Sequence, residues 1–135
     1  MKPVKNTTIL YMDDDQDDIE LLKEALCQLD PSFHLLHASN GEEGLQKLGA
    51  LKESNALPCL IVLDVNMPRL CGRKTFEKIK ADANLDHIPV VIFSTSDNEK
   101  DRAHFAGKSV EYMTKPVQFS LFVEAAKRLL NFCQN

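Results

Sequence analysis

The octapeptide Ile-Val-Leu-Asp-Val-Asn-Met-Pro at residues 61–68 joins a short apolar run to a polar turn. Its first part, Ile61–Leu63, is continuous and partly β-branched, which is typical of a strand that is buried on both faces. Val90–Phe93 is a second run of the same kind. Strands of this composition occur in parallel sheets that helices cover on both sides. The two runs therefore predict an α/β fold.

Strand-like runs alternate with helical patterns along the whole chain. Ile19, Leu22, Leu26 and Leu29 recur at the spacing of one helical face. The alternation predicts a single doubly wound (βα)5 domain over residues 1–135, with a parallel sheet of order 2-1-3-4-5 and no output domain after it. The expected strands are Thr8–Met12, Phe33–Ala38, Cys59–Leu63, Val90–Phe93 and Val110–Met113. The first expected helix ends at Leu29, and the second runs from Asn40 to about Leu51. The other three helices are expected at 73–81, Asp97–Phe105 and Phe119–Cys133.

The composition excludes several classes of partner and location. Hydrophobic residues make up 44% of the chain, charged residues make up 27%, and the net charge at pH 7 is -4. With this charge, a basic patch large enough to bind nucleic acid is not expected. No apolar run approaches the ~18 residues of a membrane span, and the N-terminal segment lacks the features of a signal peptide. We therefore expect a cytoplasmic protein with no nucleic-acid or membrane partner.

The cysteines show no local pairing motif. Cys27, Cys59, Cys71 and Cys133 are spread over the chain, and none belongs to a C-x-x-C pair. A domain of this length has enough core to fold without disulfides. Cysteines in such a cytosolic protein are usually reduced, and we expect four free thiols.

Polar residues follow four of the five expected strands, at the point where each strand ends. Asp13–Asp15 follow the first strand, and Asp64 follows the third. Ser94-Thr95 follows the fourth, and Thr114-Lys115-Pro116 follows the fifth. Ligands of open α/β sheets bind at the carboxyl ends of the strands, near the switch in strand order. The residues expected to converge there are Asp13, Asp14, Asp64, Ser94 and Lys115.

This grouping of carboxylates, a lysine and a hydroxyl indicates phosphoryl chemistry. Crowded carboxylates repel each other unless a cation is present, and a few oxygen ligands suit Mg²⁺. A carboxylate such as Asp64 can attack phosphorus, and phosphoryl transfer chiefly needs positioning and neutralisation of charge. Each element alone also suits an ordinary turn, helix start or surface residue. These ordinary roles would have to occur together at all four strand ends by chance. A phosphoryl site explains all four at once and is therefore favoured.

The same residues resemble the receiver domain of response regulators, a family with a flavodoxin-like fold, over nearly the whole chain. The segments that carry the resemblance are Ile9–Asp15, Ile61–Pro68, Pro89–Thr95 and Tyr112–Pro116. In detail the sequence is similar to stand-alone receivers that serve sensor histidine kinases, including bacteriophytochrome kinases. The resemblance implies a signalling phosphoprotein of a two-component phosphorelay, and not a turnover enzyme.

The resemblance implies a role for each residue of the site. Asp64 is the phosphoacceptor, and its donor is the phosphohistidine of a sensor histidine kinase or a histidine phosphotransfer protein. Mg²⁺ is bound by Asp14, Asp64 and the backbone carbonyl of Asn66, while Asp13 helps to hold the waters of the metal. Lys115 contacts the acyl phosphate.

The resemblance also implies a conformational switch. Ser94 is the switch hydroxyl, and Tyr112 is the aromatic side chain that changes rotamer. Thr95 departs from the family, in which the residue after the switch hydroxyl is usually very small, and it is expected to limit access to the phosphoacceptor. The Lys115–Pro116 peptide bond is commonly cis in this family. The signal is expected to leave through the fourth helix, fifth strand and fifth helix, toward a partner or a second copy.

Three other functions compete with this interpretation. A phosphatase of the haloacid dehalogenase type needs a second aspartate two residues after the nucleophile, where this chain has Asn66. A docking module that has lost phosphorylation does not require the complete set of site residues. A flavin-binding protein needs a phosphate-cradling loop after the first strand, and the five aspartates of residues 13–18 would repel that phosphate.

Overall fold

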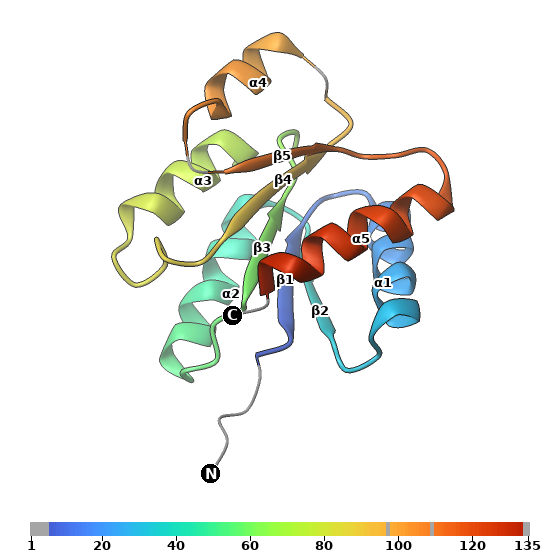
Figure 1. Cartoon of the computed structure of the whole chain (residues 1–135). Coiled ribbons are helices and arrows are strands. Elements are labelled where there is room, and N and C mark those ends of the chain that lie inside the picture. Colours follow the sequence, from blue (N-terminus) through green and yellow to red (C-terminus); the bar gives the residue numbers. More distant parts are fainter. Residues whose placement is uncertain (1–5, 97, 109, 134–135) are drawn as a thin grey trace.

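The computed structural model describes residues 6–96, 98–108 and 110–133. Strands and helices alternate through these residues (Figure 1). All strand pairings are parallel, in the order β2-β1-β3-β4-β5. The predicted fold class and strand order are therefore confirmed. The elements are β1 (Thr8–Met12), α1 (Gln16–Leu29), β2 (His34–Ala38), α2 (Gly41–Glu53), β3 (Leu60–Leu63), α3 (Gly72–Ala81), β4 (Val90–Ser94), α4 (Glu99–Phe105), β5 (Glu111–Thr114) and α5 (Phe119–Cys133).

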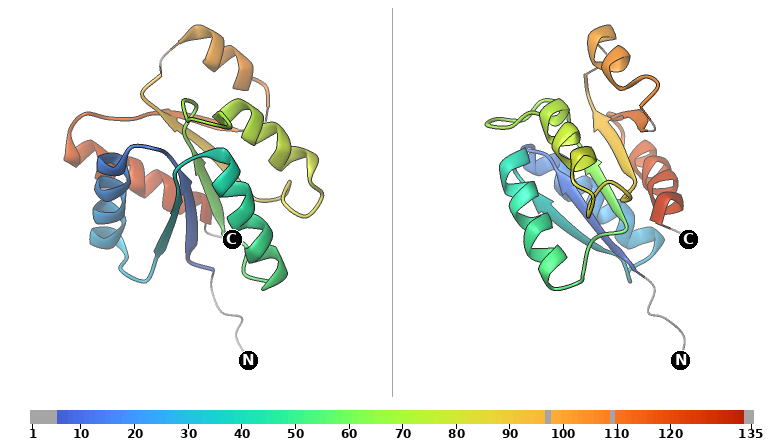
Figure 2. Two further views of the ribbon diagram at one scale, coloured as in Figure 1. Left: turned by 180° about the vertical axis from the view of Figure 1, so that it is seen from behind. Right: turned by 90° about the vertical axis from the view of Figure 1, so that its left-hand side faces the viewer.

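Each face of the sheet packs against its own helices (Figure 2). Successive side chains of a strand point to opposite faces. Ile9 and Tyr11 of β1 therefore pack in the cluster that includes residues of α1 and α5, whereas Leu10 and Met12 pack with residues of α2 and α3. Every residue of β3 and β4 is buried. Burial on both faces explains why these two strands have continuous apolar sequences.

Side-chain caps set the starts of the helices that flank β2. The Asp15 carboxylate accepts hydrogen bonds from the backbone N–H groups of Asp17 and Asp18, at the first turn of α1. The Asn40 side chain accepts one from the backbone N–H of Glu43, at the predicted start of α2. Such caps satisfy N–H groups that have no partner inside the helix. No helix among the described residues is long and apolar enough to cross a membrane.

Helix α4 is shorter than predicted. Its first residue is Glu99, and the Asn98 side chain caps it by accepting a hydrogen bond from the backbone N–H of Lys100. The predicted start, Asp97, lies outside the described residues. The last residue, Phe105, is as predicted and packs into the core against α3.

Two of the four cysteines form a disulfide, so the prediction of four free thiols is wrong. Cys59 lies just before β3 and Cys133 ends α5, and their Cα atoms are 4.9 Å apart. The two residues are 74 positions apart in the sequence, so no local motif indicates the pair. They meet because α5 packs back across the sheet toward the start of β3. Cys27 and Cys71 are free, as predicted.

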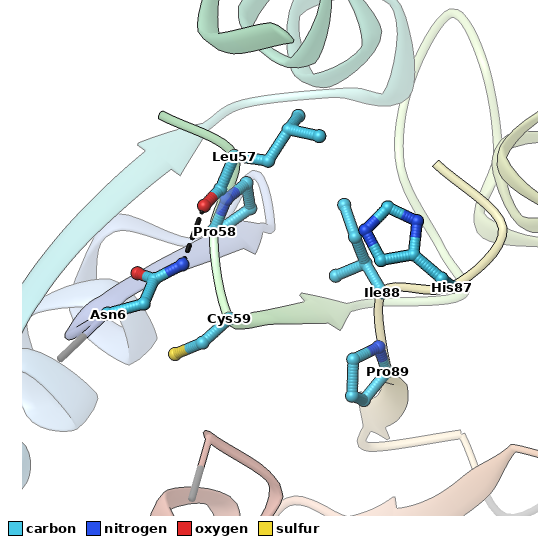
Figure 3. A pocket seen from close by; sticks show the side chains of 7 residues that line it. All are labelled: Asn6, Leu57, Pro58, Cys59, His87, Ile88 and Pro89. Carbon is cyan, nitrogen blue, oxygen red and sulfur yellow. Dashed lines mark hydrogen bonds between the residues drawn. The ribbon is translucent and has the colours of Figure 1, made fainter. Parts of the chain in front are cut away.

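A pocket lies beside Cys59, at the amino-terminal ends of the strands. Its lining is drawn in Figure 3, where the Asn6 side-chain amide donates a hydrogen bond of 2.8 Å to the carbonyl of Leu57. None of the residues predicted for the functional site lines this pocket. Those residues lie at or near the carboxyl ends of the strands, so the predicted site lies at the opposite edge of the sheet from this pocket. The lining residues are Asn6, Leu57, Pro58, Cys59, His87, Ile88 and Pro89.

Candidate functional site

The carboxyl ends of β1 and β3 bring three aspartates together. β1 and β3 are neighbours in register, and Asp13 and Asp64 directly follow them. Carboxylate oxygens of Asp13, Asp14 and Asp64 all lie within 4.8 Å of one another. Asp13 and Asp64 are buried, whereas Asp14 is exposed. The fold thus places the three predicted carboxylates in one cluster that opens to solvent at Asp14.

Lys115 is the cation of this cluster. Its backbone N–H donates a hydrogen bond of 2.9 Å to the carbonyl of Ser94, which fixes the end of β5 beside β4. Its Nζ is 2.5 Å from Asp13 Oδ2 and 3.4 Å from Asp64 Oδ2. Burial lowers the pKa of Lys115, but the neighbouring carboxylates outweigh that effect and raise the pKa above its usual range. The ammonium therefore stays charged at neutral pH.

Some neighbours of Asp64 raise its pKa and others lower it. Burial raises its pKa above the ordinary value, and the charge of Asp13 adds to the rise. The Lys115 ammonium acts in the opposite direction, together with hydrogen bonds from the Ser94 side chain and the Asn66 backbone. The net direction is upward. A cation bound beside Asp64 would favour its carboxylate form.

Tyr11 is a buried member of the site that the sequence analysis did not find. Its hydroxyl donates a hydrogen bond of 2.6 Å to Asp13 Oδ2. Burial raises the pKa of Tyr11 well above its usual range, and the charge of Asp13 raises it further. The sequence did contain a signal for this contact: Tyr11 and Asp13 are two residues apart, and residues two apart on a strand point to the same face. Tyr11 thus fixes the orientation of the Asp13 carboxylate from within the core.

Asp18 is the second residue that the sequence analysis missed. Its Oδ2 lies 2.9 Å from Lys115 Nζ, although the two residues are 97 positions apart in the chain. The acidic run of residues 13–18 indicated only a favourable helix start. The helical spacing could have shown that Asp18 faces the protein, because it lies on the same face as Leu22 and Ala25, which are both buried.

The predicted switch residues lie at the end of β4, directly after it, and within β5. Ser94 is fully buried, whereas Thr95 is exposed. Tyr112 is half-buried, and its hydroxyl donates a hydrogen bond of 2.6 Å to the carbonyl of Ser96. Its ring centroid is 6.1 Å from that of Phe105 in α4. Tyr112 therefore connects β5 to α4 and to the segment that follows Ser94.

The cis peptide bond implied by the family resemblance is absent. None of the described peptide bonds is cis, and the Lys115–Pro116 bond is among them. A trans bond is the lower-energy isomer for most X–Pro pairs, by about 0.5–1 kcal/mol.

Gly72 supports the turn that carries Asp64. Its backbone N–H donates a hydrogen bond of 2.9 Å to the carbonyl of Val65. A Cβ atom at this position would lie 2.2 Å from the backbone oxygen of Asp64, which is too close for any other residue. The start of α3 can therefore pack directly against the turn that follows β3. This contact was not predicted from the sequence.

Comparison with known proteins identifies the family. A family model described as the response regulator receiver domain matches residues 9–127. The chain belongs to this family. Two sequence relatives show the range of lengths in which such a receiver occurs. Response regulator Rcp1 from Synechocystis sp. (strain ATCC 27184 / PCC 6803 / Kazusa) is 35% identical over 96 residues, which cover 69% of this chain and 65% of Rcp1.

The second relative is a much longer protein. A probable cyclic di-GMP phosphodiesterase from Vibrio cholerae is 29% identical over 122 residues. The match covers 90% of this receiver and 26% of that protein. The receiver therefore spans about a quarter of the length of this relative.

Solved structures of similar receivers share the fold. The phosphorylated cyanobacterial phytochrome response regulator RcpA superposes with a TM-score of 0.85 at 32% identity, covering 94% of this chain and 93% of RcpA. The Mn²⁺-bound form of Rcp1 superposes with a TM-score of 0.77 at 29% identity, covering 93% of each chain. The predicted resemblance to receivers of the phytochrome-associated type is thus confirmed. The protein is a receiver domain of a two-component response regulator, a class that acts as signalling switches.

Proposed function

We propose that Asp64 accepts a phosphoryl group from the phosphohistidine of a sensor histidine kinase or of a histidine phosphotransfer protein. The observation that carries the proposal is the buried Asp64 carboxylate, which lies at a strand end beside two other aspartates and the Lys115 ammonium. A carboxylate oxygen attacks phosphorus, the phosphorus–nitrogen bond breaks, and its electron pair returns to the imidazole. An acyl phosphate forms at Asp64. RcpA, which was solved phosphorylated, supports this chemistry.

The donor set of the cluster fits Mg²⁺. Three carboxylates within 4.8 Å of one another offer hard oxygen ligands, which Mg²⁺ prefers. We assign Asp14, Asp64 and the backbone carbonyl of Asn66 as direct ligands. Asp13 already accepts hydrogen bonds from Tyr11 and Lys115, so its role is to hold the waters of the metal. Bound Mg²⁺ would neutralise the charge of the incoming phosphoryl group, and the Mn²⁺-bound form of Rcp1 supports a divalent cation in such a receiver.

We assign Lys115 and Ser94 to contact the phosphoryl oxygens. The Lys115 ammonium stays charged at neutral pH because its pKa is raised, and its Nζ lies 3.4 Å from Asp64 Oδ2. The Ser94 hydroxyl already hydrogen-bonds to Asp64 and can move to a phosphoryl oxygen on the same residue. Thr95 follows Ser94 and is exposed, and we propose that its side chain limits access to Asp64.

The signal is proposed to leave through α4, β5 and α5. A phosphoryl group adds about -1.5 to -2 charge and draws Ser94 toward it. Tyr112 is placed to respond, because it bonds to the carbonyl of Ser96 and packs on Phe105 of α4. The exposed apolar side chains of Val117 and Leu121 border the same face and support a protein contact there. The occupants that we propose are the kinase and a second copy of this chain in a homodimer.

The wider assignment follows from the same proposal. The domain of residues 1–135 acts as a receiver in the cytoplasm and does not turn over a small substrate. The kinase that supplies the phosphoryl group is of the phytochrome type, an assignment supported by the similarity to RcpA. No nucleic-acid or membrane contact takes part.

Acetyl phosphate tests the proposal without a cognate kinase. With Mg²⁺, the wild-type protein should gain one phosphoryl group, whereas Asp64→Asn should gain none. Turnover of p-nitrophenyl phosphate should be negligible, which separates a receiver from a phosphatase. Sedimentation with and without beryllofluoride, a phosphoryl mimic, tests the homodimer. Undiminished labelling of Asp64→Asn would overturn the assignment of the phosphoacceptor.

A further inference from the structure

Asp18 contacts the proposed phosphorylation site, but the chemistry described above gives it no role. We propose that Asp18 is a positioning residue: together with Asp13 it orients the Lys115 ammonium so that one N–H points at Asp64. The proposal rests on Asp64 being the phosphoacceptor. It adds a residue of α1 to a site whose other members lie in strands or in the segments that follow them.

The ammonium of Lys115 contacts three carboxylates. A lysine ammonium has three N–H donors and no acceptor. Its Nζ lies 2.5 Å from Asp13 Oδ2, 2.9 Å from Asp18 Oδ2 and 3.4 Å from Asp64 Oδ2. The two shorter contacts anchor two donors, and the third is left for Asp64, where the phosphoryl group would arrive. Only 3% of the Lys115 side chain is exposed, so protein carboxylates and not solvent are the main partners of its ammonium in the folded protein.

The phase of α1 explains why Asp18 and not its neighbour reaches Lys115. Asp17 and Asp18 both lie in the first turn of the helix, where Asp15 caps them. Asp18 lies on the buried face of α1 and only 19% of its side chain is exposed, whereas Asp17 is exposed. One helical turn thus contains a carboxylate that contacts Lys115 and an exposed carboxylate of the same charge. Asp17 is the matched control.

Asp18 has two opposing effects that substitutions can separate. Its negative charge disfavours an incoming anion, whereas its hydrogen bond orients Lys115. Asp18→Ala removes both the charge and the acceptor. Asp18→Asn removes the charge but keeps a carbonyl oxygen that can accept from Lys115. Asp17→Ala removes the same charge from the same turn and leaves the Lys115 contacts in place.

The experiment measures the affinity of each variant for beryllofluoride in excess Mg²⁺ by titration calorimetry. Asp18→Ala should bind roughly tenfold more weakly than wild type, a loss typical of removing an orienting partner. Asp18→Asn should retain most of the wild-type affinity, and Asp17→Ala should bind as wild type or more tightly. A second readout needs no metal: the ammonium protons of Lys115 should give a slowly exchanging NMR signal that broadens in Asp18→Ala.

Two binding results would contradict the positioning role of Asp18. If Asp18→Ala binds beryllofluoride as wild type does or more tightly, the repulsion of the anion by Asp18 outweighs any orientation of Lys115. An equal loss in Asp18→Ala and Asp18→Asn would show that a neutral acceptor does not orient Lys115. If wild type itself takes no phosphoryl group from acetyl phosphate, the proposed function fails. The Lys115 NMR signal in the metal-free variants still tests the positioning separately. An unchanged signal in Asp18→Ala would overturn it.

Discussion

The Tyr11 hydroxyl donates a hydrogen bond of 2.6 Å to Asp13 Oδ2, and both residues are fully buried. Loss of a buried hydrogen bond to a charged group costs about 1.5–3 kcal/mol. We predict that Tyr11→Phe lowers the free energy of unfolding by that amount, measured by urea denaturation. Tyr112→Phe is the control, since its hydroxyl bonds to a neutral carbonyl from a half-buried position. Its loss should be about 1 kcal/mol. Equal stability of Tyr11→Phe and wild type would refute this role of Tyr11.

Mg²⁺ should raise the melting temperature of the wild-type protein. A cation relieves the repulsion among Asp13, Asp14 and Asp64, and a ligand that binds only the folded state stabilises it. At a free Mg²⁺ concentration one hundred times the Kd, the gain is about 2.7 kcal/mol. Asp14→Ala should lose most of this shift, and Asp17→Ala, which changes an exposed aspartate outside the cluster, should keep it. Equal shifts in the two variants would show that the ligand set is wrong.

The pKa of Asp64 makes stability depend on pH. Burial raises this pKa in the folded state above the ordinary 3.8. Between these two values the folded protein binds more protons than the unfolded chain, so the free energy of unfolding falls as pH rises. Lys115 adds no slope there, because its pKa is raised from 10.5 and the group is protonated in both states. Asp64→Asn removes the titrating group.

The expected result is a stability difference between wild type and Asp64→Asn that depends on pH. In metal-free buffer, Asp64→Asn should melt at a higher temperature than wild type at pH 7. The difference should shrink as the pH is lowered toward ~3, below the ordinary pKa of 3.8, where Asp64 is mostly protonated in both states. Differential scanning calorimetry over this range measures it. A difference that grows on acidification would mean that the pKa of Asp64 is lowered by folding.

The Cys59–Cys133 bridge predicts a defined count of reactive thiols. Alkylation of the unreduced, unfolded protein should modify Cys27 and Cys71 only, and reduction should expose all four cysteines. The bridge joins residues 74 positions apart, so its reduction should cost about 4 kcal/mol if loop entropy dominates. The melting temperature should therefore fall on reduction, and Cys27→Ser should respond as wild type does. Four reactive thiols before reduction would contradict the bridge.

The fold was predictable because its central strands are buried on both faces. The continuous apolar runs at Ile61–Leu63 and Val90–Phe93 identified β3 and β4, and the alternation with helical patterns predicted a parallel sheet, for which 2-1-3-4-5 is a common doubly wound order. The carboxyl ends of parallel strands meet at one edge, so Asp13, Asp64 and Lys115 were placed together correctly.

Contacts that depend on side-chain phase or on distant packing were not predicted. Tyr11 lies in an apolar run and packs beside Phe93 as a core residue would, and its hydroxyl has a role only because Asp13 follows two residues later. An aspartate at position 18 is expected in the first turn of a helix, so its contact with Lys115 was not inferred. The Cys59–Cys133 pair depends on how α5 crosses the sheet, which no local sequence pattern reveals.

The central claim is that Asp64 is the phosphoacceptor, and the site of modification tests it most directly. Hydroxylamine converts an acyl phosphate to a hydroxamate on the same side chain. After incubation with acetyl phosphate and Mg²⁺, peptide mapping by mass spectrometry should find the hydroxamate at Asp64 and at no other aspartate. Protein without acetyl phosphate should contain none. A hydroxamate at Asp13, Asp14 or Asp18, or none on any peptide, would contradict the account.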